Sequence, residues 1–282
     1  MSTIERYVGV HNALGAKIAE RAGFEGIWLS GLEISASQCV PDADLITLTQ
    51  QLEILRPVIR ATSLPILVDC DAGYGNSTNA RLAARYHYEA GAAGVCIEDK
   101  PFPKMNSFVN RRQSILDPRD FAAKISAARD AVDEPAFQVV ARTEALVVGE
   151  SVESALTRAE IYRKAGADAI LVHDRSKSDE SIRDFAQRWA YDTPLIAVPT
   201  TYYSTTASQL RSYGYARVIY ANHGLRAAIR AVESVFGRII RDGGTHAVEP
   251  DIAGIEDIFD LQELDELHRL EERAKRKVRE LR

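Results

Sequence analysis

Short apolar runs alternate with amphipathic stretches along most of the chain. The runs are largely continuous and rich in Val and Ile, which is typical of strands that are buried on both faces. They predict eight strands, at residues 7–11, 26–29, 65–70, 94–97, 138–142, 169–173, 195–198 and 217–220. Eight short and fully buried strands are therefore the main prediction from the hydrophobic pattern.

Segments with a helical period separate these strands. Three of them end at an Ala-Gly pair, where the glycine is typical of a helix C-terminus, and they lie at residues 15–22, 79–90 and 151–165. Repeated strand–helix units predict a parallel sheet, and eight units favour an α/β fold of the closed (β/α)₈ TIM-barrel type. A Rossmann-type open sheet is the alternative, which is disfavoured because no GxGxxG follows any predicted strand.

The pattern changes after Gly243 and Gly244. Residues 249–282 are strongly charged and have a helical period, with acids early and bases late, as suits the helix dipole. An apolar stripe on this helix would dock on the barrel or on a neighbouring subunit, and it comprises Leu261, Leu264, Leu267 and Leu270. We predict a catalytic barrel domain at 1–244 and a charged helical C-terminal extension at 245–282.

Charge and cysteine content narrow the range of partners. The formal net charge of −5 over 282 residues gives no indication of binding to nucleic acid or to a membrane. The three cysteines lack CxxC spacing and are typical of reduced thiols, and we identify neither a signal peptide nor an apolar run of about 18 residues. The sequence thus predicts a cytoplasmic protein whose partner is a small molecule.

Acidic side chains follow two neighbouring predicted strands. Asp69 and Asp71 lie two apart at the end of the third strand, where they would share a face, and Glu98 follows the fourth strand. Active sites of parallel barrels lie at these strand ends, so the three carboxylates would converge. They would repel one another without a cation, and oxygen ligands suit Mg²⁺ or Mn²⁺. The alternative is a set of surface acids that cap helices.

The segment EDKPFPKMNS, at residues 98–107, has neither a helical nor a strand period. Lys100 and Lys104 are cations, Asn106 and Ser107 offer hydrogen bonds, and two prolines restrict the backbone between them. This composition predicts a loop that covers an anionic substrate held by a metal. A solvated polar loop is the alternative.

Two further candidates end the fifth and sixth strands. Arg142 follows an apolar run, so its charge needs an anion, which would be either the substrate or Glu144 or Glu98 in a structural ion pair. His173 would take part in catalysis or serve as a hydrogen-bonded residue at the barrel rim.

Several motifs match a known family, among them DCDAGYGN, EDKPFPKMNS, ARTEAL and YANHGLRA. On these motifs, from about residue 11 to residue 244, the chain resembles the phosphoenolpyruvate (PEP) mutase/isocitrate lyase superfamily and, within it, the PEP phosphomutases. The spacing between Glu98-Asp99-Lys100 and Asn106-Ser107 is the mutase hallmark in this resemblance. The acidic strand ends are shared by the whole superfamily.

The resemblance implies a Mg²⁺-dependent isomerase that interconverts PEP and phosphonopyruvate, the step that forms the carbon–phosphorus bond in phosphonate biosynthesis. It implies that Asp69 ligates the metal, while Asp71 and Glu98 act mainly through metal-bound water. It also implies a homodimer or a homotetramer.

The resemblance assigns the substrate contacts as well. Contacts to the pyruvyl end would come from Ser30, Gly31 and Leu32. Contacts to the phosphoryl group would come from Asn106, Arg142 and His173, with Asp42 near the transferring group. A gating loop would close over the site and carry Lys104, Asn106 and Ser107.

The chain departs from the family pattern at Leu29, Ala72, Thr143 and Asp174, and Asp174 would add a negative charge near the phosphoryl group. A phosphonopyruvate hydrolase is therefore an alternative, since segments 40–53 and 241–244 are hydrolase-like, whereas the Asn106-Ser107 pair favours a mutase.

Two other classes are weaker alternatives. A carbon–carbon lyase or oxaloacetate decarboxylase of the superfamily is disfavoured, because an isocitrate-type lyase would carry a KKCGH loop and no cysteine here has that context. A non-catalytic binding protein is disfavoured by the intact acids and Arg142.

Overall fold

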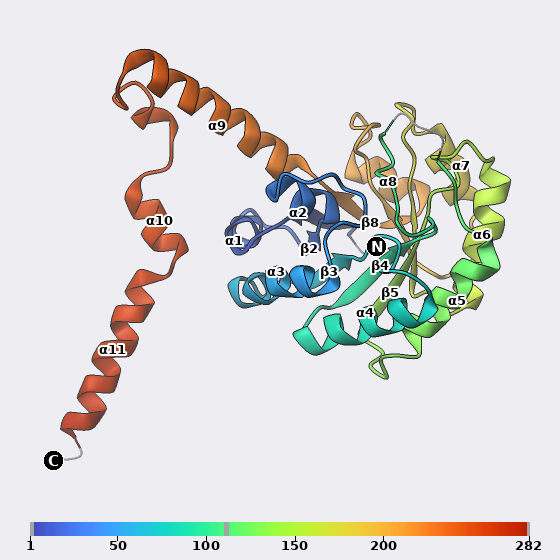
Figure 1. Ribbon diagram of the computed structural model, residues 1–282, viewed down its shortest axis with the longest axis horizontal. Helices are drawn as coiled ribbons and strands as arrows, with labels where there is room; N and C mark the ends of the chain where they lie inside the picture. Colours follow the sequence, from blue (N-terminus) through green and yellow to red (C-terminus); the bar gives the residue numbers. More distant parts are fainter. Residues whose placement is uncertain (1–2, 110–112, 281–282) are drawn as a thin grey trace. The chain divides into compact units, whose positions relative to one another are not determined.

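The computed structural model describes residues 3–109 and 113–280 (Figure 1). The chain divides into two compact units, Met1–Leu225 and Arg226–Arg282. The boundary of the catalytic domain that the sequence predicts, at residue 244, stays a prediction.

Eight parallel strands form a closed barrel in the first unit, in the order β1 to β8, with β8 paired to β1. Their bounds are β1 Glu5–Val10, β2 Gly26–Leu29, β3 Ile66–Asp69, β4 Gly94–Glu98, β5 Gln138–Thr143, β6 Ala169–Val172, β7 Leu195–Ala197 and β8 Tyr215–Tyr220. All eight predicted strands are confirmed. The TIM-type fold is confirmed as well, because an open Rossmann sheet would leave β1 and β8 unpaired.

Helices follow the strands and cover the barrel (Figure 1). Their bounds are α1 Ala13–Arg21, α2 Gly31–Ser37, α3 Leu48–Ala61, α4 Ser77–Ala90, α5 Pro118–Arg129, α6 Val152–Lys164, α7 Glu180–Arg188 and α8 Ala207–Tyr213. The three predicted helices correspond to α1, α4 and α6. Gly91 ends α4 in the left-handed conformation, at φ 101°, which a glycine adopts without steric cost.

Apolar side chains form two layers because they alternate along each strand. Trp28 belongs to a small cluster formed by alternate residues of the strands, together with Tyr7, Leu67 and Cys96. Ile27 and Leu29, on either side of Trp28, pack in the larger cluster between strands and helices. The rigid double layer positions the strand ends that carry the polar side chains.

The second unit contains most of α9 (His223–Asp242), a short 3₁₀ helix η1 (Glu249–Asp251), α10 (Ile255–Leu261) and α11 (Leu264–Arg279). The predicted helix at 249–282 is thus interrupted, because Glu263 takes the left-handed conformation between α10 and α11. The predicted charge order is present in α11, which begins with Asp265 and Glu266 and ends with basic residues. In the described part of the chain, no helix has the length and apolar character that crossing a membrane requires.

Candidate active site

A small pocket of about 40 Å³ lies at the C-terminal ends of the strands. It is lined by most of the predicted site residues, namely Ser30, Leu32, Asp42, Asp69, Lys104, Asn106, Ser107, Arg142 and His173. The other three predicted residues, Gly31, Asp71 and Glu98, contact members of this set. The structure therefore brings together all the residues that the sequence singled out.

The acids of the pocket come from two strands and a turn. Asp69 ends β3 and Glu98 ends β4. Asp71 lies beyond the end of β3 and has a φ of 47°, which is not a strand conformation. The prediction that Asp69 and Asp71 share one face of a strand is therefore wrong, although the two side chains do lie in one cluster. The turn after β3, rather than strand alternation, directs both aspartates into one cluster.

Gly31 allows the backbone to approach this cluster. Its N–H donates to Asp69 Oδ2 at 3.2 Å. A Cβ atom at Gly31 would lie 2.9 Å from Asp71 Oδ1 and 3.3 Å from Asp69 Oδ2. A side chain at this position would therefore displace the acids, which explains a glycine directly after Ser30.

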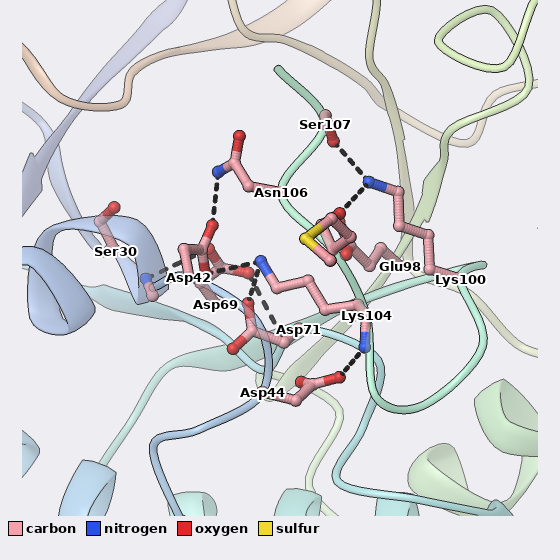
Figure 2. Close-up of polar contacts among 12 residues, drawn as sticks. Ser30, Asp42, Asp44, Asp69, Asp71, Glu98, Lys100, Lys104, Asn106 and Ser107 are labelled. Carbon is pink, nitrogen blue, oxygen red and sulfur yellow. Dashed lines mark hydrogen bonds and ion pairs between the residues drawn. The ribbon is translucent and has the colours of Figure 1, made fainter. Parts of the chain in front are cut away.

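Lys104 places its ammonium among the acids (Figure 2). Its Nζ lies 2.8 Å from Asp42 Oδ1 and 2.8 Å from Asp71 Oδ1. Burial works against the charge of Lys104, but Asp71 and the neighbouring acids raise its pKa well above the usual value. Burial also works against the charge of Asp42, and Lys104 holds the pKa of that carboxyl below its usual value.

One ammonium does not compensate the whole cluster. Burial raises the pKa of Asp69 to about 6, although Lys104 and Arg142 act in the opposite direction. Burial likewise raises the pKa of Asp71 well above its usual value. Glu98 Oε1 is buried and has no hydrogen-bond partner among residues 3–109 and 113–280. A further cation would relieve all three groups.

These carboxylates fit a hard cation such as Mg²⁺, because they supply buried oxygen atoms and no thiol or imidazole. Within the described ranges, no three acidic, His or Cys side chains are arranged to hold a metal ion directly. Mg²⁺ usually keeps several waters, so carboxylates that are not all within direct reach of one ion still fit it.

On the other side of the pocket, which we call the compensated side, the positive charge of Arg142 is balanced by neighbouring acids. Its Nε is 2.6 Å from Glu144 Oε1 and 3.3 Å from Glu98 Oε2, so the ion pair weighed from the sequence is present. Its Nη2 lies 2.9 Å from His173 Nδ1 and 3.4 Å from Ser107 Oγ. Arg142 still lines the pocket, so pairing with protein acids leaves it next to the space for a substrate.

Glu144 organises this side, and the sequence indicated it only as a partner for Arg142. It is fully buried and accepts a hydrogen bond from Ser107 Oγ at 2.5 Å. His173 Nδ1 lies 2.7 Å from its Oε1, and Lys100 Nζ lies 3.3 Å from its Oε2. Burial alone would raise the pKa of Glu144, but Arg142 and His173 lower it well below the usual value.

The loop at 100–107 is closed over the pocket by contacts at both ends. Lys100 Nζ donates to Met105 O and Ser107 Oγ, each at 2.8 Å, so this lysine holds the loop together (Figure 2). Asn106 Nδ2 donates to Asp42 Oδ2 at 2.5 Å, and the Asn106 N–H donates to Asp42 O at 3.2 Å. The alternative of a solvated loop does not describe these buried contacts.

Further residues of the site were not predicted. Trp28, Phe108, Thr200 and Asn222 also line the pocket. The ring of Phe108 meets the ring of His173 edge-on, with 5.7 Å between centroids. Trp28 lies on β2, and Thr200 and Asn222 follow β7 and β8 by three and two residues, so only their place near a strand end could have indicated them.

Asp174, the departure with an added charge, does not line this pocket. Its Oδ1 accepts a hydrogen bond from the Ser176 N–H at 2.8 Å. This contact directs the carboxylate into the turn after β6. Its charge therefore does not lie in the wall of the pocket.

Comparison with known proteins places this geometry in a family. The family model described as phosphoenolpyruvate phosphomutase matches residues 2–240. The PEP phosphomutase of Tetrahymena pyriformis is 44% identical over 253 residues, which cover 89% of this chain and 84% of that protein.

Solved structures are similar over almost the whole chain. The PEP phosphomutase from Streptomyces platensis subsp. rosaceus has a TM-score of 0.95 and 48% identity, covering 97% of this chain and 95% of that one. A phosphonopyruvate hydrolase in complex with oxalate and Mg²⁺ has a TM-score of 0.90 and 39% identity, covering 96% and 94%. Mutases and a hydrolase are thus similar to this chain to nearly the same degree. The chain is an enzyme that belongs to the PEP mutase family, within the PEP mutase/isocitrate lyase superfamily.

Proposed function

We propose that this enzyme is a Mg²⁺-dependent PEP mutase, which interconverts PEP and phosphonopyruvate by intramolecular phosphoryl transfer. The observation that carries the proposal is the closed loop, in which Asn106 contacts Asp42 and Lys104 contacts both Asp42 and Asp71. Transfer within one molecule requires that water be kept from the phosphoryl group, and a closed loop supplies that exclusion.

The acidic side of the pocket would hold the pyruvyl unit. Asp69 would bind Mg²⁺ directly, and Asp71 and Glu98 would orient its water ligands. When bound, the ion supplies Lewis-acid stabilisation of enolate charge on the pyruvyl unit. The Ser30 hydroxyl and the backbone of Gly31 and Leu32 would bind the carboxylate end, since Ser30 and Leu32 line the pocket.

The compensated side would hold the phosphoryl group. Arg142, His173 and Asn106 line the pocket and offer donors to its oxygens, while Ser107 supports Arg142 from the loop. Asp42 lies beside Asn106 and Lys104, where it would adjoin the transferring group. A loose, metaphosphate-like transfer needs positioning and charge stabilisation more than covalent chemistry, and these fixed side chains supply both.

Substrate entry requires that the loop opens or that Lys104 moves. The pocket of about 40 Å³ is far below the roughly 300–1,000 Å³ that is common for ligand sites. The ammonium of Lys104 occupies the space between Asp42 and Asp71, so its displacement would both admit the substrate and free the acids. We further propose, from the family resemblance, a cytoplasmic homodimer or homotetramer.

The test is ³¹P NMR of the purified enzyme with phosphonopyruvate and Mg²⁺. We expect a growing PEP signal. Phosphonopyruvate hydrolase is the second candidate, favoured by 39% identity to a solved hydrolase over 96% of this chain. Inorganic phosphate without PEP would establish that activity and reject the mutase. Neither product would reject both.

A further inference from the structure

Asp44 lies in the segment between α2 and α3 that also carries Asp42, and it faces the gating loop (Figure 2). It is outside the group of residues that line the pocket. Its Oδ2 accepts a hydrogen bond from the backbone N–H of Lys104 at 2.5 Å, across 60 positions of the sequence. Asp44 therefore contacts the gating loop and not the space for the substrate.

Lys104 is held at both ends by this one segment. Its backbone N–H is fixed by Asp44, and its ammonium lies 2.8 Å from Asp42 Oδ1. Asp42 also fixes Asn106 through the side chain and the backbone. Two aspartates separated by a single residue thus hold two of the three predicted gating residues, and only Asp42 faces the pocket.

An aspartate at position 44 lowers the stability of the fold in two ways, which indicates a specific role. Its backbone is in the left-handed region, with φ 56°, where residues other than glycine are strained, although Asp and Asn tolerate it best. Its Oδ1 is buried without a hydrogen-bond partner in the described residues. Burial raises the pKa of Asp44, while the backbone N–H groups of Lys104 and Ala72 act to lower it.

We propose that Asp44 is a positioning residue that determines reaction specificity: by holding the backbone of Lys104, it keeps the gating loop closed, so that the phosphoryl group passes to the pyruvyl oxygen and not to water. The proposal rests on the mutase activity proposed above.

The two outcomes differ in which oxygen reaches phosphorus. In both, the C–P bond of phosphonopyruvate breaks and its electron pair stays on the pyruvyl unit as an enolate. In isomerisation the enolate oxygen forms the new P–O bond and gives PEP. In hydrolysis a water oxygen forms that bond, inorganic phosphate leaves, and a proton from the water converts the enolate to pyruvate. A loop that opens more often admits the water.

Asp44→Gly and Asp44→Asn make a matched pair for the test. Both residues accept a positive φ, but only Asn keeps an oxygen that accepts from the Lys104 N–H. Cys39→Gly controls for a new glycine at a positive φ, because Cys39 is exposed, has φ 56° and lies in the same segment. Each full-length variant is given phosphonopyruvate and Mg²⁺, and the ratio of phosphate to PEP is measured by ³¹P NMR.

We expect Asp44→Gly to raise the phosphate-to-PEP ratio roughly tenfold, as for the loss of one hydrogen bond to a charged group. Asp44→Asn and Cys39→Gly should stay near the ratio of the unaltered enzyme. Amide hydrogen exchange of residues 100–107 should be faster only in Asp44→Gly. If Asp44→Gly does not fold, Asp44→Ala is compared with Cys39→Ala, which places an alanine at the same φ of 56° in the same segment.

An unchanged product ratio in Asp44→Gly would overturn the proposal, whether or not exchange becomes faster. A raised ratio in Cys39→Gly would overturn it as well, because the effect would then come from backbone flexibility. If the unaltered enzyme forms phosphate and no PEP, the proposed function fails and the specificity role fails with it. In that case, hydrogen exchange still shows whether Asp44 holds the loop.

Discussion

The two sides of the pocket differ in the balance of buried positive and negative charge. Around Asp69, acids outnumber the nearby cation Lys104, and burial raises the pKa of Asp69 to about 6. Glu144 is contacted by three basic side chains, of which Arg142 also lies 3.3 Å from Glu98, and Arg142 and His173 lower the pKa of Glu144 well below its usual value against the effect of burial. One side is short of positive charge, and the other is prepared for an anion. The difference indicates where a metal and a phosphoryl group would bind.

The largest effect expected is on the acidic side. Asp69→Asn should lower activity on the order of 10³-fold, because it removes the proposed direct ligand and its charge. It should also abolish the rise in melting temperature that Mg²⁺ produces in the unaltered enzyme. Asp174→Asn is the control, since that buried acid is directed into a turn. Full activity after exhaustive EDTA treatment would contradict the metal site itself.

Glu144→Gln tests the compensated side. The substitution removes the carboxylate that pairs with the buried charges of Arg142 and Lys100. The free energy of unfolding should therefore fall by about 3–5 kcal/mol. Denaturant titration measures this change. Glu150→Gln, which weakens a more exposed pair with Arg158, should cost much less. Equal losses in the two variants would remove the contrast between buried and exposed pairs.

The same kind of neutral substitution should have the opposite effect on the acidic side. Without metal, Asp69→Asn should raise the free energy of unfolding by up to about 3 kcal/mol at pH 8, since the pKa of Asp69 is about 6 in the fold against about 3.9 unfolded. Because the pKa is raised in the fold, ionisation begins to oppose folding above the unfolded pKa of about 3.9 and opposes it fully above about pH 6. The gain should therefore shrink as pH falls from about 6 to 4. A loss of stability at pH 8 in EDTA would refute this account.

The smallest effect concerns the loop that joins the two sides. Asn106→Ala should lower kcat by about 10²-fold and change KM little, because the lost contact acts on the group that moves. Steady-state kinetics with phosphonopyruvate measures both. Asn79→Ala, which removes a capping residue of α4, is the control. A raised KM with unchanged kcat would assign Asn106 to ground-state binding.

Local patterns in the chain were sufficient to predict the barrel and most members of the site. Fully buried strands are recognisable as short apolar runs in the sequence, such as ILVD of β3 and AILV of β6. The number of these runs predicted that the sheet closes into a barrel. Residues directly after such strands, such as Asp69 and Arg142, could be selected because strand ends in a parallel barrel meet at one rim. The motif at 98–107 then indicated the family.

How these residues act on one another follows from the three-dimensional arrangement alone. Lys104 lies between Asp42 and Asp71, Glu144 joins Arg142 to Lys100, and Asp44 holds a backbone 60 positions away. Asp71 reaches the cluster through a turn with φ 47° and not through strand alternation. Such contacts depend on where separate loops meet, and on which charges remain uncompensated once water is removed. Neither quantity has a local pattern in the chain.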